Sequence, residues 1–143
     1  MSNTTRKVTT HWKGNTQFEA DGPGGKTVLM DTTAEHGGHN SGMGPKAMML
    51  ASLAGCSGLD VVSILDKMKV KISDFRMETV GELTEEHPKY FHKVYVDYHF
   101  FGNNLNENKI NKAVNLSIEK YCGVMEMFRR FAKVTTKVHI HNS

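Results

Sequence analysis

Residues 45–65 constrain the fold more than any other part of this chain. They are apolar almost all round the helix that they would form, and Lys46 and Asp60 are their only charged members. Pro45 suits the first position of a helix, where a missing N–H costs nothing. A helix without a polar stripe has to be covered on more than one side, so the pattern predicts a central helix over residues 45–68.

The same stretch has the length of a membrane span, for which about 20 apolar residues are enough. Its small and polar residues, Asp60 among them, favour a helix buried within protein instead. Residues 1–11 are polar and lack the apolar segment of a secretory signal. We therefore expect a cytoplasmic protein with no membrane partner.

The remaining segments divide by their hydrophobic period. Short extended runs separated by turn residues predict a strand meander over residues 1–35. Alternation predicts a strand pair over residues 70–101 and a last strand over residues 133–141, while a helical period covers residues 105–132. Strands grouped between helices, without strict alternation, predict the α+β class with antiparallel sheet, in one domain of residues 1–143.

Charge excludes one class of partner. The formal net charge is +3, and no basic run is longer than the pair Arg129 and Arg130. No stripe of basic residues alternates with aromatic ones, so we expect no nucleic-acid partner.

Two cysteines are the main candidates for chemistry. Cys56 lies within the predicted central helix, and Cys122 stands where the later helical period is interrupted. They are too few for a metal cage and too far apart for a CxxC motif. One thiol could react and the other resolve, or both could be buried as small hydrophobes, which residue content alone favours. A helix starting at Gly123 would lower the pKa of Cys122 through its dipole.

The neighbours of Cys56 in the sequence do little to stabilise its thiolate. Asp60 lies four residues later on the same helix face, where its charge would disfavour a thiolate. Met48 and Met49, with Phe128 and Phe131, suggest the apolar wall of a pocket, although plain core explains them equally well.

Histidines are the next candidates, as metal ligands. His139 and His141 are two residues apart on one face of the predicted last strand, and His36 and His39 lie in a glycine-rich loop. Such pairs could share a metal, but no thiol or carboxylate accompanies them at tight spacing. The pattern favours solvated surface histidines, and we expect no metal site.

Two segments carry a family resemblance. Residues 44–62 surround Cys56 and residues 119–124 surround Cys122. With the separation of the cysteines and the order of elements, they make the chain resemble the OsmC/Ohr family, named for osmotically inducible protein C and organic hydroperoxide resistance. Within it, the Asp-Val-Val sequence after the first cysteine resembles a poorly characterised subgroup.

The resemblance implies a homodimer in which antiparallel sheets wrap around two long central helices. It implies an antioxidant, stress-response thiol peroxidase without a cofactor. Cys56 would be the peroxidatic cysteine that reduces a small organic hydroperoxide, and Cys122 the resolving cysteine that forms a disulfide with it. An external dithiol, such as a lipoylated protein, would reduce that disulfide.

Two departures qualify this resemblance. The catalytic members carry a glutamate where this chain has Lys46, and an arginine in the early hairpin, whereas residues 8–74 contain no arginine. Ten residues of helix span about 15 Å, so Lys46 would activate the cysteine of a second subunit, not its own Cys56, or else be a solvated lysine. The alternative function is a dimeric protein that binds a small apolar ligand or senses redox state, with weak or no peroxidase turnover. A third interpretation has both thiols inert.

Overall fold

The computed structural model describes residues 4–143, so the first three residues of the predicted meander lie outside it. The chain forms two compact units, Met1–Met49 and Leu50–Ser143. Each unit is described separately, and the expectation of a single domain stays a prediction.

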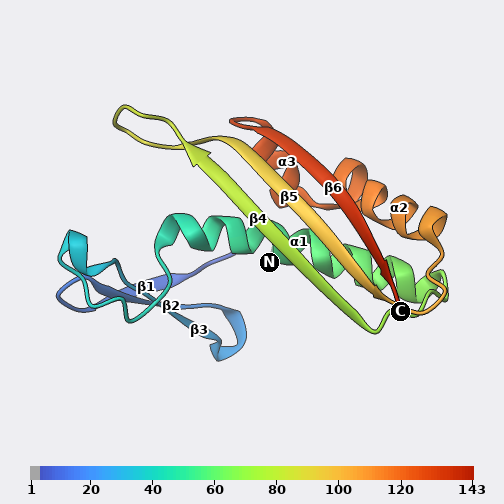
Figure 1. Cartoon of the computed structure of the whole chain (residues 1–143). Helices are drawn as coiled ribbons and strands as arrows, with labels where there is room; N and C mark the ends of the chain where they lie inside the picture. Colours follow the sequence, from blue (N-terminus) through green and yellow to red (C-terminus); the bar gives the residue numbers. More distant parts are fainter. Residues whose placement is uncertain (1–3) are drawn as a thin grey trace. The chain divides into compact units, whose positions relative to one another are not determined.

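The first unit is built on the predicted meander, which forms one antiparallel sheet in the order β1-β2-β3 (Figure 1). Gly14 and Asn15 both have positive φ and make the tight turn between the first two strands. The strands are β1 (Thr9–Gly14), β2 (Gln17–Asp21) and β3 (Thr27–Met30).

Asp31 organises the loop that follows β3. Its buried carboxylate accepts hydrogen bonds from the hydroxyls of Thr16 and Ser41 and from the backbone N–H groups of Thr32, His39 and Ser41. These donors, the Ser41 and Thr16 hydroxyls first, hold the pKa of Asp31 far below its ordinary value. One carboxylate thereby gives the loop a fixed path.

Residues 4–49 of the first unit form no apolar core of their own. Among them only Asp31 and Gly38 are buried. Trp12 is 67% exposed, and Phe18 and Val28 are also exposed. A three-stranded sheet needs an apolar face packed against something else to be stable, and the described residues of the first unit do not supply that cover.

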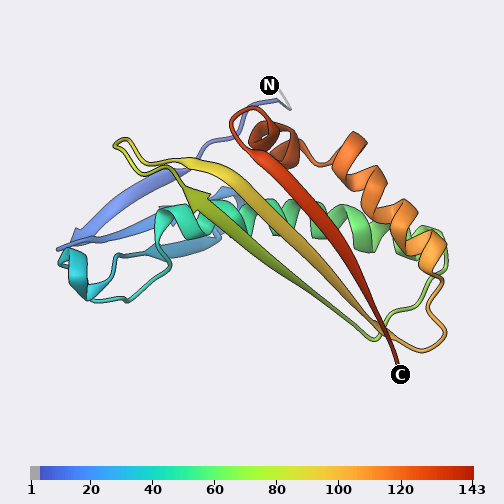
Figure 2. The ribbon, with the colours of Figure 1, turned by 45° about the horizontal axis from the view of Figure 1, so that its top comes forward.

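The second unit is a mixed three-stranded sheet with helices on one face, as Figures 1 and 2 show. Its elements are the greater part of α1 (Pro45–Lys67), β4 (Asp74–Leu83), β5 (Phe91–Gly102), α2 (Glu107–Leu116), the π-helical turn η3 (Ser117–Tyr121), α3 (Gly123–Arg129) and β6 (Lys133–Asn142).

The α+β class is confirmed, but the prediction of wholly antiparallel sheet is wrong in one place. β4 and β5 pair antiparallel, whereas β5 and β6 pair parallel, with Lys93 opposite Lys133. The helical segments between β5 and β6 carry the chain back to the starting end of β5, which a parallel pair requires. The strand pair also begins at Asp74 instead of residue 70.

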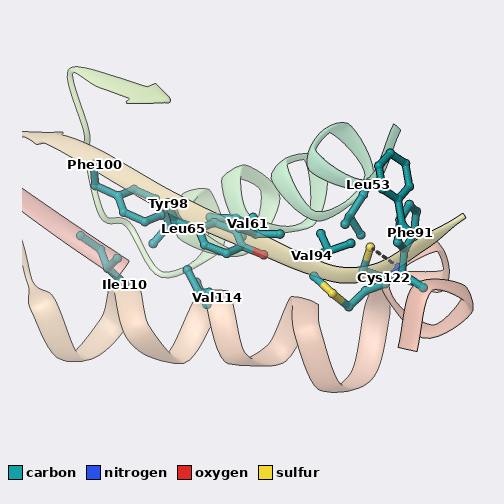
Figure 3. Close-up of a cluster of buried hydrophobic side chains, with 14 residues drawn as sticks. Leu53, Val61, Leu65, Phe91, Val94, Tyr98, Phe100, Ile110, Val114 and Cys122 are labelled. Carbon is teal, nitrogen blue, oxygen red and sulfur yellow. Dashed lines mark hydrogen bonds between the residues drawn. The ribbon is translucent and has the colours of Figure 1, made fainter. Parts of the chain in front are cut away.

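One apolar core fills the space between this sheet and its helices (Figure 3). Each element contributes the residues that its period turns inward. The buried side chains include Leu53, Val61 and Leu65 of α1, Val94, Val96, Tyr98 and Phe100 of β5, Ile110 and Val114 of α2, and Met125 and Phe128 of α3.

The opposite side of α1 is uncovered. Leu59 is 73% exposed, Val62 is exposed, and a side chain at Gly55 would meet nothing. Within residues 4–143, α1 is the one helix long and apolar enough to cross a membrane by length and composition, a test that core helices also pass. Within the second unit, the expected central helix is therefore covered on one side only.

Candidate functional site

Cys56 and Cys122 come together in the second unit. Cys56 is half-buried in the middle of α1 and packs against the core, whereas Cys122 is only 3% exposed. Figure 3 places Cys122 at the end of the core, beside Leu53, Phe91 and Val94. Both thiols are free, and Cys56 is close enough to perturb Cys122.

The π-helical turn η3 delivers Cys122 to this position. The Cys122 N–H donates to the carbonyl of Ser117, 2.8 Å away and five residues back. Cys122 then leaves the helix with extended backbone, and its sulfur accepts a hydrogen bond of 3.3 Å from the N–H of Met125. The predicted helix start at Gly123 is confirmed. Single π turns often occur at functional sites, because the extra residue changes the direction of the side chains after it.

The predicted lowering of the Cys122 pKa is wrong. Burial, followed by the neighbouring Cys56 sulfur and the Asp60 charge, raises the pKa of Cys122 to about 11. The N–H of Met125 opposes the shift but does not overcome it. The seven-residue helix α3 gives this sulfur one N–H donor. The removal of water from around the sulfur raises its pKa by more than that donor lowers it. Cys122 is thus a protonated thiol at neutral pH.

A buried chain of hydroxyls connects the two cysteine-bearing segments. Ser57 Oγ lies 2.7 Å from Tyr98 Oη and 2.8 Å from Ser117 Oγ, and Ser117 Oγ lies 3.2 Å from Asp60 Oδ2. A carboxylate can only accept, so Tyr98 donates to Ser57, Ser57 to Ser117 and Ser117 to Asp60. Ser57 follows Cys56 directly, and Ser117 holds the N–H of Cys122. The chain therefore ties both cysteines to one rigid network.

Tyr98 stays neutral within this chain. Burial, with smaller effects of Cys122 and Asp60, raises the pKa of Tyr98 to about 12, although its hydrogen bond with Ser57 acts in the opposite direction. Its phenol therefore donates over the whole neutral range.

Sequence reasoning missed Ser57, Ser117 and Tyr98. A signal was available for each, because all three occupy inward positions of apolar elements, where a hydroxyl needs a hydrogen-bond partner. The spacing of apolar residues along each element could not show that these three side chains face one another.

The other predicted residues differ in their placement. Asp60 does belong to the site, as the acceptor at the end of the hydroxyl chain. Lys46 and Met49 are exposed and lie in the first unit, so their roles at Cys56 stay predictions. Phe128 is buried core. Among residues 4–143 no three metal-ligating side chains could hold an ion together.

Asp60 also lines a groove of about 440 Å³ in the second unit. Its apolar walls are formed by Ile64 of α1, Met68 directly after α1, Leu116 of α2 and Tyr121 of η3. Neither cysteine lines this groove, so it reaches the site only through Asp60 and the hydroxyl chain behind it.

Comparison with known proteins establishes the family. Residues 38–137 match the family described as OsmC-like protein. The chain belongs to the OsmC-like family. This OsmC-like chain is 31% identical to the protein YhfA of Escherichia coli K12 over 124 residues, which are 87% of this chain and 90% of that protein.

Several solved structures share the fold. A hypothetical protein from Aquifex aeolicus superposes with a TM-score of 0.85 at 24% identity, over 100% of this chain and 99% of the other. The organic hydroperoxide resistance protein OsmC from Legionella pneumophila gives 0.71 at 20% identity, over 97% and 99%. OhrB of Bacillus subtilis, also an organic hydroperoxide resistance protein, gives 0.66 at 19% identity, over 96% and 99%.

Proposed function

We propose that this OsmC-like protein is a thiol peroxidase that reduces small organic hydroperoxides through Cys56 and Cys122. The supporting observation is the pairing of two free thiols, one half-buried in α1 and one held beside it at the π turn. Two relatives in fold are named for organic hydroperoxide resistance.

In the first step the Cys56 thiolate attacks the terminal oxygen of the hydroperoxide. The O–O bond breaks, the leaving alkoxide takes a proton to become the alcohol, and Cys56 becomes a sulfenic acid. Cys56 suits this role better than Cys122, because Cys122 is nearly inaccessible and holds its proton.

In the second step Cys122 loses its proton and attacks the Cys56 sulfur. Water leaves and the disulfide forms. Asp60 is our candidate for the proton acceptor, since its charge acts on Cys122 and it belongs to the same network. The sulfurs must approach to about 2.05 Å. The non-helical backbone at Cys122 is where that movement fits, and an external dithiol then restores both thiols.

The proposal includes a homodimer. The sheet of the first unit has no cover within that unit, and within the second unit α1 has an uncovered apolar side with Leu59, Val62 and Gly55. A second copy of the chain would cover both, with the sheets wrapped around paired α1 helices. Lys46 and Met49 would then complete the site at Cys56 of the partner subunit, Lys46 as a cation and Met49 as pocket wall. We place this stress-response activity in the cytoplasm, where thiols stay reduced.

Thiol titration tests the peroxidase. The protein is treated with one equivalent of cumene hydroperoxide, and free thiols are counted against time. We expect both thiols to disappear within seconds, Cys56→Ser to abolish the reaction and Cys122→Ser to accumulate a sulfenic acid. Thiol loss as slow as that of free cysteine would overturn the proposal.

That slow outcome would favour a second candidate, a dimeric small-molecule-binding or redox-sensing protein. The observation behind it is that residues 8–74 contain no arginine, so the cation expected beside the thiolate is missing from the early hairpin.

A further inference from the structure

Three histidines gather on the face of the second sheet that the helices leave open. His99 of β5 is the register partner of His139 of β6, and His141 lies two residues further along the same face. The rings of His99 and His139 stack with centroids 4.2 Å apart. The sequence showed only the His139 and His141 pair, because pairing with β5 is what adds His99.

His99 and His141 contact each other through one nitrogen of each ring. His99 Nδ1 lies 3.0 Å from His141 Nε2, at hydrogen-bond distance. Their ring centroids are 5.2 Å apart and their planes are nearly parallel, at an angle of 15°.

A carboxylate lies beside the other nitrogen of His99. Glu78 Oε1 is 3.1 Å from His99 Nε2, and its charge favours the tautomer that carries the proton on Nε2 and keeps the lone pair on Nδ1. Asp97 Oδ1 accepts a hydrogen bond of 2.8 Å from His139 Nε2. A carboxylate on the far nitrogen is the usual support of a metal-binding histidine, because it orients the ring and strengthens the ligand.

The separation of the two nitrogens suits one shared ion. Two imidazoles bound at about 2.0–2.1 Å, at an angle of roughly 90–110°, hold their nitrogens about 2.8–3.4 Å apart. A metal ion would replace the shared hydrogen, and His141 would shift its proton from Nε2 to Nδ1, so no net proton is released. His99 is 12% exposed at its side chain, and the exposed His141 ring stacks on Phe101 with centroids 4.5 Å apart. The two nitrogens face each other across a hydrogen bond, so His141 has to turn before both can bind one ion.

We propose that His99 Nδ1 and His141 Nε2 form a binding site for a borderline divalent transition-metal ion such as Zn²⁺, supported by Glu78. Imidazole suits Zn²⁺, Ni²⁺ and Cu²⁺ and discriminates against Mg²⁺ and Ca²⁺. No third protein ligand converges on this point within residues 4–143, so water completes the coordination and the ion exchanges. The site is separate from the cysteines and does not depend on the peroxidase.

Zn²⁺ titration of the full chain carrying Cys56→Ser and Cys122→Ser tests the site without thiol ligands. Calorimetry should show one ion bound per chain. Imidazole ¹⁵N resonances should shift at Nδ1 of His99 and at Nε2 of His141. His141→Ala should weaken binding by about tenfold or more, and Glu78→Ala by roughly tenfold through the lost support.

His36→Ala serves as the matched control, because His36 is an exposed histidine of the first unit and its loss should leave binding unchanged. Thermal melts without metal separate lost binding from lost folding. The proposal fails if no Zn²⁺ binds at millimolar concentration, if His141→Ala binds like the control, or if the shifted nitrogens belong to other histidines.

Discussion

Ser57 Oγ lies 2.8 Å from Ser117 Oγ inside the second unit, and this contact joins the helix of Cys56 to the turn of Cys122. The two cysteine-bearing segments are therefore joined by a hydrogen bond between two serine hydroxyls. Tyr98 and Asp60 extend it at either end. A buried polar network is stabilising only while every member is satisfied, so its members should be sensitive to single changes.

Ser57→Ala tests this network. The change strands the Tyr98 hydroxyl and removes one partner of Ser117, which should lower the free energy of unfolding by about 1–3 kcal/mol in urea denaturation. The control is Ser63→Ala on the exposed side of α1, where we expect a change below about 0.5 kcal/mol. Equal costs at the two serines would contradict the network.

Alkaline pH tests the protonated Cys122. Its folded pKa is about 11 against an ordinary 9.0, so the unfolded chain releases this proton first and stability falls as pH rises from about 9 to 11. At pH 10 the loss attributable to Cys122 should be roughly 1.4 kcal/mol. Urea denaturation at pH 8 and pH 10 measures it, with Cys122→Ser as comparison. If that variant loses as much stability, the pKa of Cys122 is not raised.

Asp60→Asn tests the proposed proton acceptor. We expect Cys56 to be oxidised by cumene hydroperoxide at least as fast as in the wild type, while the disulfide forms more slowly and sulfenic acid accumulates. Trapping with dimedone and mass spectrometry resolves the two steps. The control is Asp66→Asn, an exposed carboxylate of α1. Disulfide formation as fast as in this control would exclude Asp60 from the second step.

Leu59→Lys tests the dimer. The substitution puts a charge on the uncovered side of α1 and should convert a dimer to monomer in light scattering after size exclusion. Thr135→Lys, an exposed position of β6, should leave the dimer intact. A monomeric wild type, or a Leu59→Lys variant that stays dimeric, would show that something else covers this helix.

Asp31→Asn tests the loop of the first unit. An amide cannot accept all the hydrogen bonds that Asp31 accepts, so we expect faster proteolysis within residues 32–44 at pH 7. Because the pKa of Asp31 is held low, the carboxylate's contribution is present above its ordinary pKa and is lost as pH falls below it. The two proteins should therefore converge in acid. Glu35→Gln, an exposed change in the same loop, is the control.

Much of the fold could be predicted from the sequence, because the helices and strands follow from the spacing of apolar residues along the chain. The run from Pro45 to Lys67 and the alternation in β5 are local patterns, and both became the expected elements. The parallel pairing of β5 and β6 could not be predicted, since alternation is the same in either direction.

The site was only partly predictable. Cys56 and Cys122 stand out by residue type, but their surroundings depend on contacts between distant segments. The pKa of Cys122 is raised where we expected it to be lowered, because the effect of burial is larger than that of one N–H donor. No local sequence pattern reports burial of this kind. The meeting of Ser57 with Ser117 and of His99 with His141 likewise required three dimensions.

The π turn at Ser117–Tyr121 constrains the number of residues in this segment as well as the identity of Ser117. Removing one residue would restore an ordinary α-helix and swing Cys122 by about 100° around the axis, away from Cys56. The side chains of exposed Glu119 and Lys120 are not constrained in this way. Substitutions can therefore accumulate at these two positions during evolution, yet a single insertion or deletion there would separate the two sulfurs.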